Sequence, residues 1–135
     1  MPTKVAFEPE AGVVVLELGG EVTLDETEEA LEAIPSRPWF RPRLKMVADA
    51  RNCTTRMTGK DVERLAAFAR QLDDAWGETR WAVLAPDDLV YGLARIYMAL
   101  TEDYQVQTHV FRNVQDVNDW LGIGVDIEEI LKRAA

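Results

Sequence analysis

The side chains that most often carry out catalysis are scarce in this sequence. Cys53 is the only cysteine and His109 the only histidine among its 135 residues. A thiol becomes a good nucleophile when a nearby imidazole takes up its proton, so these two residues form the one pairing that would support nucleophilic catalysis. We expect Cys53 to follow the third strand and His109 to lie within the last one. The alternative interpretation is a small loop cysteine and an ordinary strand histidine.

Acid–base, metal and phosphate chemistry have equally little support. The carboxylates fall mostly on predicted solvent-facing helix faces, and no pair is marked by its spacing as acid and base. One cysteine and one histidine exclude an internal disulfide, a cysteine-rich zinc site and a multi-histidine site. Gly19-Gly20 and residues 122–124 lack the strand–loop–helix context of a phosphate-binding loop. The sequence therefore predicts a domain that is not an enzyme and holds neither metal nor cofactor.

A basic and aromatic segment offers a different kind of chemistry. It lies among prolines 35, 38 and 42, which exclude a helix or a central strand, and contains no acidic residue. One interpretation is a site for an anionic ligand or a membrane surface. The other is a loop whose aromatic rings cover the sheet edge while its cations offset an acidic helix. The residues concerned are Arg37, Trp39, Phe40, Arg41, Arg43 and Lys45.

The net charge of -9 argues against a nucleic acid as partner, because the phosphate backbone would be repelled by most of the surface. Residues 37–64 are an exception, with eight basic side chains against three acidic ones. No stretch approaches the roughly 20 apolar residues needed to cross a bilayer. The first residues also lack the basic and apolar pattern of a secretory signal. We therefore expect a cytoplasmic protein without a transmembrane segment.

A helix predicted from Asp87 onward has an apolar arc too wide for one buried face. Its expected core stripe consists of Leu89, Leu93, Ile96, Tyr97 and Leu100. On the other side we expect an interface with a second copy of the protein, or a ligand surface, in which a glycine permits close approach and an arginine lies at the rim. The residues of this second surface are Tyr91, Gly92, Ala94, Arg95 and Met98.

Hydrophobic periodicity supplies the elements that must position these residues. Residues 3–8 and 12–19 predict a leading hairpin. The apolar runs at 44–50, 79–86 and 106–111 are typical of interior parallel strands, and helical patterns separate them. The order β-β-α-β-α-β-α-β-α-α predicts a single α/β domain over residues 1–135, with a mixed, mostly parallel sheet of about five strands.

Residues 79–122 resemble the SpoIIAA-like family of small bacterial proteins, which are related to STAS domains. In that family a strand ending in Ala-Pro precedes a helix containing Gly-Leu-Ala-Arg, and a strand ending in Val-Phe-Arg precedes a helix ending in Trp-Leu. The matching residues here are 85–86, 92–95, 110–112 and 120–121, whereas residues 3–76 match in element order alone. The resemblance implies the SpoIIAA-like fold, which lipid-binding CRAL-TRIO domains share.

The resemblance also implies a binding or regulatory domain that acts through a protein partner or a small amphipathic ligand. The alternative is a CRAL-TRIO-like carrier of a lipid or an anionic small molecule, which a sizeable apolar cavity would favour. An enzyme would instead need a deep cleft that holds several polar groups with shifted pKa values.

One residue is singled out by the resemblance as a phosphoacceptor. STAS domains of anti-sigma-factor antagonists are phosphorylated on a Ser or Thr at the start of the helix that follows the buried strand. Thr58 occupies the matching position, although Met57 replaces the acidic residue before it. Independently of any phosphorylation, Thr58 is expected to be the N-cap of its helix.

Overall fold

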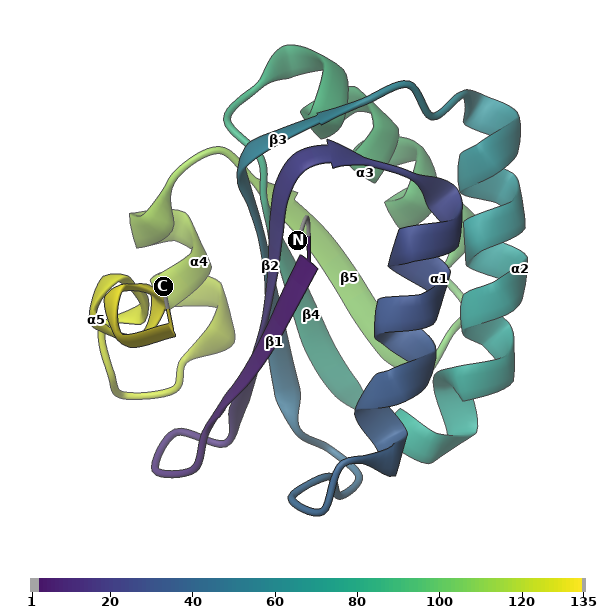
Figure 1. The fold of residues 1–135 in the computed structure, drawn as a ribbon. Helices are drawn as coiled ribbons and strands as arrows, with labels where there is room; N and C mark the ends of the chain where they lie inside the picture. Colours follow the sequence, from purple (N-terminus) through teal and green to yellow (C-terminus); the bar gives the residue numbers. More distant parts are fainter. Residues whose placement is uncertain (1–2, 135) are drawn as a thin grey trace.

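A five-stranded sheet in the order β1-β2-β3-β4-β5 lies at the centre of the computed structural model, which describes residues 3–134 (Figure 1). The antiparallel hairpin of β1 (Thr3–Glu8) and β2 (Val13–Val22) forms one side. Parallel pairing then continues through β3 (Lys45–Thr55), β4 (Thr79–Leu84) and β5 (Val106–Phe111). The predicted element order, the leading hairpin and the mixed sheet are confirmed.

Helices cover both faces of this sheet (Figure 1). One face carries α1 (Leu24–Ala33), the short 3-10 helix η1 (Ile34–Ser36), α2 (Gly59–Trp76) and α3 (Asp88–Leu100). The other face carries α4 (Val114–Leu121) and α5 (Ile127–Ala134). The side chains of the strands alternate between the two layers, so one core forms beneath α4 and α5 and a second forms beneath α1 and α2. No helix within residues 3–134 is long and apolar enough to cross a membrane.

Two expectations about the strands were wrong. The run at 106–111 is not interior, because β5 has only β4 as a neighbour and the chain continues into helices. Its side chains accordingly alternate, with Thr108 buried and His109 exposed. The third strand is also longer than residues 44–50. Beyond an irregularity between Glu17 and Gly19, β2 keeps pairing with β3 as far as Thr55, so Cys53 lies within the strand and not after it.

Candidate functional site

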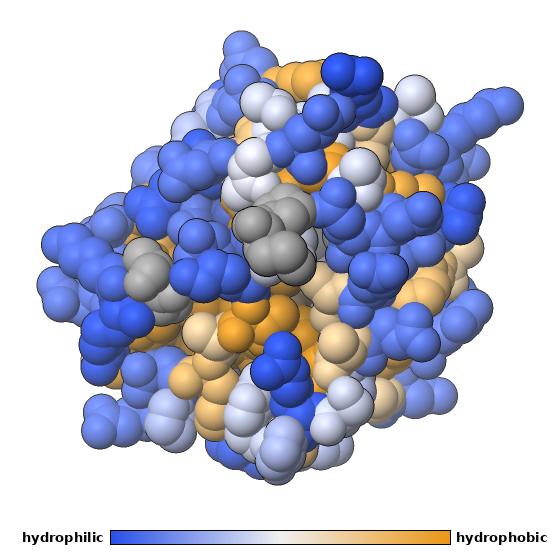
Figure 2. Space-filling view, viewed as in Figure 1, coloured by the Kyte–Doolittle hydropathy of each residue, from blue (hydrophilic) through white to orange (hydrophobic). Residues whose placement is uncertain are grey.

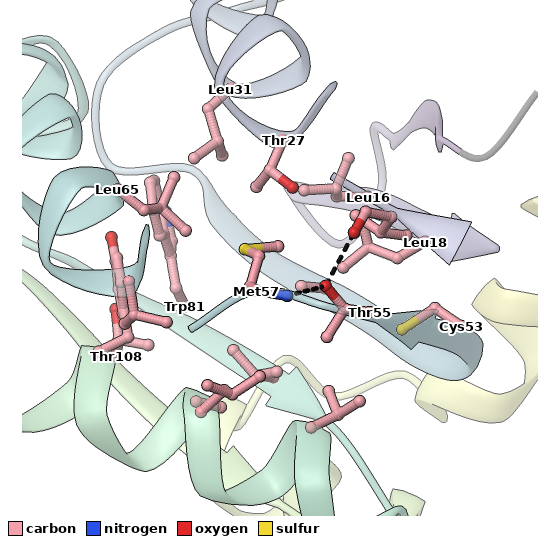
Figure 3. A pocket seen from close by; sticks show the side chains of 18 of the residues that line it. Leu16, Leu18, Thr27, Leu31, Cys53, Thr55, Met57, Leu65, Trp81 and Thr108 are labelled. Carbon is pink, nitrogen blue, oxygen red and sulfur yellow. Dashed lines mark hydrogen bonds between the residues drawn. The ribbon is translucent and has the colours of Figure 1, made fainter. Parts of the chain in front are cut away.

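An apolar cavity of about 140 Å³ lies between the sheet and the layer formed by α1, α2 and α3. All three helices contribute side chains to it, as do β2, β3, β4 and β5 (Figure 3). The residues that line it are Leu16, Leu18, Val22, Thr27, Leu31, Met46, Ala48, Cys53, Thr55, Met57, Val62, Leu65, Trp81, Val83, Val90, Leu93, Ala94, Tyr97 and Thr108.

The cavity exists because small side chains occupy positions where larger ones would fill the space between the sheet and the helices. Ala48 on β3 and Ala94 on α3 both line it. The helix layer is held in place by caps: Thr23 accepts a hydrogen bond from the Glu26 backbone N–H at the start of α1, and the Asp87 carboxylate accepts two at the start of α3. These caps stabilise the starts of the two helices that cover the cavity.

The segment between β3 and α2 brings Met57 into the lining. The Thr55 hydroxyl donates to the Val22 carbonyl at 2.8 Å and accepts from the Met57 backbone N–H at 3.1 Å (Figure 3). These bonds tie the end of β3 to the end of β2 and turn the Met57 side chain toward the cavity. A methionine here is an adaptable wall, since its unbranched side chain changes shape at little cost.

Few polar side chains line the cavity, and two of their hydroxyl groups are bonded to the backbone. The Thr27 hydroxyl donates to the Thr23 carbonyl at 2.9 Å, and that of Thr55 is bonded as described above. The Nε1 nitrogen of Trp81 differs, because it is buried without a hydrogen-bond partner in the described chain. Burial raises the pKa of the Tyr97 hydroxyl well above its usual range, and Tyr104 and Asp73 add to this shift. No lysine, arginine, histidine or carboxylate is among the lining residues of the described chain.

The structure does not bring Cys53 and His109 together. Cys53 lines the cavity, whereas His109 points to the opposite layer, where its ring lies 5.0 Å from that of Trp120. Burial raises the pKa of the Cys53 thiol, and the charges of Asp87 and Asp49 raise it further. A thiol in this environment stays protonated at neutral pH and is a poor nucleophile.

Thr58 is the N-cap of α2, as expected. Its hydroxyl accepts from the Asp61 backbone N–H at 3.2 Å, and the Asp61 carboxylate accepts from the Thr58 backbone N–H at 2.9 Å. This reciprocal capping box satisfies two backbone donors that the helix leaves free. Its side chain is exposed, and phosphorylation there stays a prediction.

Removing this cap should have a measurable cost. We expect Thr58→Ala to lower the free energy of unfolding by about 0.5–2 kcal/mol, because the Asp61 N–H loses its acceptor. Thr58→Asp should be close to neutral, since a carboxylate also accepts at a helix N-terminus and suits its dipole. Urea unfolding of both variants measures the difference, and equal destabilisation by the two would contradict the capping role.

The basic and aromatic segment is divided between packing and solvent. Trp39 stacks on Phe7 with ring centroids 4.6 Å apart, and Phe40 meets Trp76 edge-on at 5.1 Å. Both rings pack against the core beneath α1 and α2, and Figure 2 shows apolar surface gathered between β1 and α1. Arg37, Arg41 and Arg43 are exposed. The aromatic residues thus cover the sheet edge, while binding of an anion or a membrane by the cations stays a prediction.

Lys45 has a structural partner on the other layer. Its Nζ donates to the Leu121 carbonyl at 2.6 Å, and a guanidinium nitrogen of Arg80 donates to the Trp120 carbonyl at 2.6 Å. Both cations therefore satisfy carbonyls at the end of α4, where the helix dipole favours positive charge. Together with Arg43 they border a polar hollow that Glu78 also lines.

The expected orientation of α3 was correct for two of the five core residues and wrong for the other three. Leu89, Ile96 and Leu100, which were expected in the core, are 58%, 41% and 42% exposed. Tyr91, Ala94 and Met98 instead pack around a buried cluster that joins the sheet to this helix, formed by Ala50, Ala85 and Val110. Leu93 and Tyr97 of the expected core stripe do face inward, where they line the cavity, so the buried face of α3 is rotated toward Tyr91, Ala94 and Met98 and not reversed.

Two further residues of the predicted interface are exposed. Arg95 faces solvent, and a methyl group added at Gly92 would meet no atom within 4 Å, so packing within the described chain does not require the glycine. Contact with a second copy stays a prediction, for which the outer side of α3 is the available face. The alternative prediction, a ligand surface on this helix, applies to Ala94, because this residue lines the cavity.

Most of the cavity residues escaped prediction from sequence. Trp81 and Thr108 were interpreted only as parts of two strands and Met57 only as the residue before Thr58, and nothing in their local pattern marks them as cavity residues. The one usable signal is the pair of alanines, Ala48 and Ala94, at positions that face the layer between sheet and helices. Small residues at inward positions of two elements indicate unfilled space beside each element. Only the packing of the elements shows that the two spaces form one cavity.

Comparisons with known proteins bear on the fold. No family model matches the sequence, and no curated protein matches it. Among solved structures, the chain is similar to an uncharacterised protein of the DUF3478 family with a SpoIIAA-like fold from Shewanella loihica PV-4. The two share 12% sequence identity, with a TM-score of 0.57 over 88% of this chain and 91% of that one. The predicted resemblance is thus confirmed in its fold, and the chain is an α/β domain with a SpoIIAA-like fold.

Proposed function

We propose that this domain binds a small apolar molecule, without chemical conversion, in the cavity between the sheet and α1, α2 and α3. The observation that carries the proposal is the cavity of about 140 Å³ with its apolar lining. Apolar side chains around an unfilled space lack contact partners, which a bound apolar molecule would supply.

The volume limits the size of the occupant. An engineered cavity of roughly 150 Å³ in another protein binds benzene, whereas pockets for drug-sized ligands begin near 300 Å³. The cavity here therefore fits a molecule of about one ring. This supports a small ligand over a long-chain lipid, and so favours the first of the two functions considered above over a CRAL-TRIO-like carrier.

The character of the lining supports binding over catalysis. General acid–base chemistry needs titratable groups within reach of the substrate, and none of the lining residues in the described chain is a carboxylate, histidine or lysine. The one thiol, Cys53, has a raised pKa. A SpoIIAA-like fold also suggests a binding or regulatory domain in general.

Binding is tested by filling the cavity. Ala94→Leu should abolish calorimetrically detected binding of toluene and raise the free energy of unfolding by about 1–2 kcal/mol, because the added methylene groups occupy the space. Ala99→Leu is the matched control, since Ala99 lies on the exposed side of the same helix and outside the lining. It should change neither quantity.

Native mass spectrometry of freshly purified wild-type protein provides a second test. We expect a fraction of the molecules to retain a small neutral mass that Ala94→Leu lacks and Ala99→Leu keeps. Toluene affinity that is the same in all three proteins would contradict binding in this cavity, as would absence of toluene binding in the wild type.

A further inference from the structure

We infer that the protein has a second binding site, for a small molecule that carries a phosphate group, in the polar hollow where β3, β4 and β5 begin. This hollow has a volume of about 430 Å³, which lies within the range of small-molecule sites. In the described chain it shares no lining residue with the apolar cavity. The inference is therefore independent of the proposed function.

Positive charge is concentrated in this hollow, although the chain as a whole has a net charge of -9. Among the described residues, three cations line it, Arg43, Lys45 and Arg80, against the single carboxylate of Glu78, which leaves a net charge of +2. None of the three cations forms an ion pair within residues 3–134, whereas six other arginines do. The hollow is thus suited to an anion from outside the chain.

Two of these cations are neighbours on adjacent strands. Lys45 and Arg80 lie one position before the paired residues Met46 of β3 and Trp81 of β4, and both side chains reach carbonyls of α4. Like charges on neighbouring strands begin about 5 Å apart and repel each other. Each cation donates one N–H to its carbonyl, at 2.6 Å, and keeps further N–H groups available. An anion between the two would replace their repulsion with two attractions.

Arg43 reaches the hollow from a strained backbone. Within the described chain it is the one residue other than glycine with a left-handed φ, at 71°. The Trp76 carbonyl accepts its N–H at 2.7 Å, and the Thr79 hydroxyl donates to the Leu44 carbonyl at 2.8 Å, so bonds on both sides hold this conformation. Glycine would adopt it without steric cost, and strained residues cluster at functional sites. An arginine at this position points to a use of its guanidinium, which donates no hydrogen bond within residues 3–134.

The donors indicate the kind of anion. An arginine guanidinium donates two parallel N–H groups to a phosphate, and Arg43 and Arg80 supply two guanidinium groups. A phosphate monoester has a charge of about -2, which matches the hollow, whereas a carboxylate would leave one positive charge unpaired. Gln105 and Gln107 also line the hollow and offer amide groups to hydroxyls elsewhere on the ligand. A phosphorylated sugar combines both features.

Four compounds separate these features: ribose 5-phosphate, inorganic phosphate, ribose and acetate. Each is titrated into the wild-type protein at pH 8 and constant ionic strength, and binding is followed in proton–nitrogen correlation spectra. We expect ribose 5-phosphate to bind most tightly and to shift the side-chain amide resonances of Gln107. Acetate should bind at least tenfold more weakly than inorganic phosphate, and ribose should not bind measurably.

Substitutions of Arg43 test the site itself. Arg43→Gln should weaken binding of ribose 5-phosphate at least tenfold. Arg37→Gln is the matched control, because it removes the same charge from an exposed residue of the same segment that does not line the hollow, and it should change the affinity less than twofold. Arg43→Gly should lose binding like Arg43→Gln, yet unfold at the same urea concentration as the wild type or a higher one, because glycine suits the left-handed backbone.

Several outcomes would overturn the inference. Absence of binding of both phosphate compounds by the wild type would exclude the site, and equal losses in Arg43→Gln and Arg37→Gln would show a response to net charge alone. Acetate that binds as tightly as inorganic phosphate would exclude the phosphate class. Unfolding of Arg43→Gly at a lower urea concentration would mean that the arginine serves stability. Toluene binding in the apolar cavity is measured separately, and its failure would leave this site unaffected.

Discussion

Met98→Glu should lower the free energy of unfolding by about 2–4 kcal/mol. Met98 packs with Ala94 and Tyr91 of α3 against the buried Ala50, Ala85 and Val110. A glutamate at this position would place a carboxylate among apolar side chains. The side chain must then lose hydration or pull α3 away from the sheet, and either change destabilises the native state.

Ile96→Glu is the control on the same helix. Ile96 is 41% exposed on the outer side of α3, so its carboxylate would stay in water and the change in stability should be within about 0.5 kcal/mol. Urea denaturation followed by circular dichroism measures both variants. A nearly neutral Met98→Glu together with a strongly destabilising Ile96→Glu would mean that α3 presents the opposite face to the sheet.

Trp76→Ala should be the most destabilising of the substitutions considered, at about 3–5 kcal/mol. Trp76 ends α2, is 0% exposed, and lies edge-on to both Phe40 and Trp81. Its backbone carbonyl accepts from the Arg43 N–H at 2.7 Å. The indole therefore packs between β4 and the segment that contains Phe40, and truncation to alanine would leave a void at this junction.

Trp120→Ala applies the same chemical change to a half-buried ring. Trp120 packs beside His109 and Phe111 on α4, and we expect a loss of about 1–2 kcal/mol, because less area leaves water on folding. Thermal and urea unfolding of the two variants give the comparison. Similar losses for Trp76→Ala and Trp120→Ala would show that the junction at Trp76 contributes no more than an ordinary surface aromatic contact.

The contacts of Trp76 also bear on the role of the basic and aromatic segment. From sequence, its aromatic rings were compatible with either a binding surface or a cover for the sheet edge. The contacts of Trp39 with Phe7 and of Phe40 with Trp76 show that the rings are structural. Composition alone does not distinguish these cases, because an aromatic ring has the same hydrophobicity whether a ligand or its own protein covers it.

Local chemistry by itself determined the elements and the fold class of this protein. Caps such as Thr58, with Asp61 three residues later, mark helix starts because they act through neighbours in the chain. The alternation of apolar strands and helical patterns determined a mixed, mostly parallel sheet, because each apolar run must find a covered face.

Only the tertiary structure decided which side of α3 faces the sheet, that β5 is an edge strand, and that a cavity exists. The apolar arc of α3 covers more than half of its circumference, so the sequence of the helix does not decide which part of this arc faces the sheet. The cavity depends on Ala48, Ala94 and Trp81, which come from three elements and share no local pattern. Each of these features depends on contacts between segments that are distant in the chain. The hydrophobic periodicity of one segment does not identify the segment that packs against it.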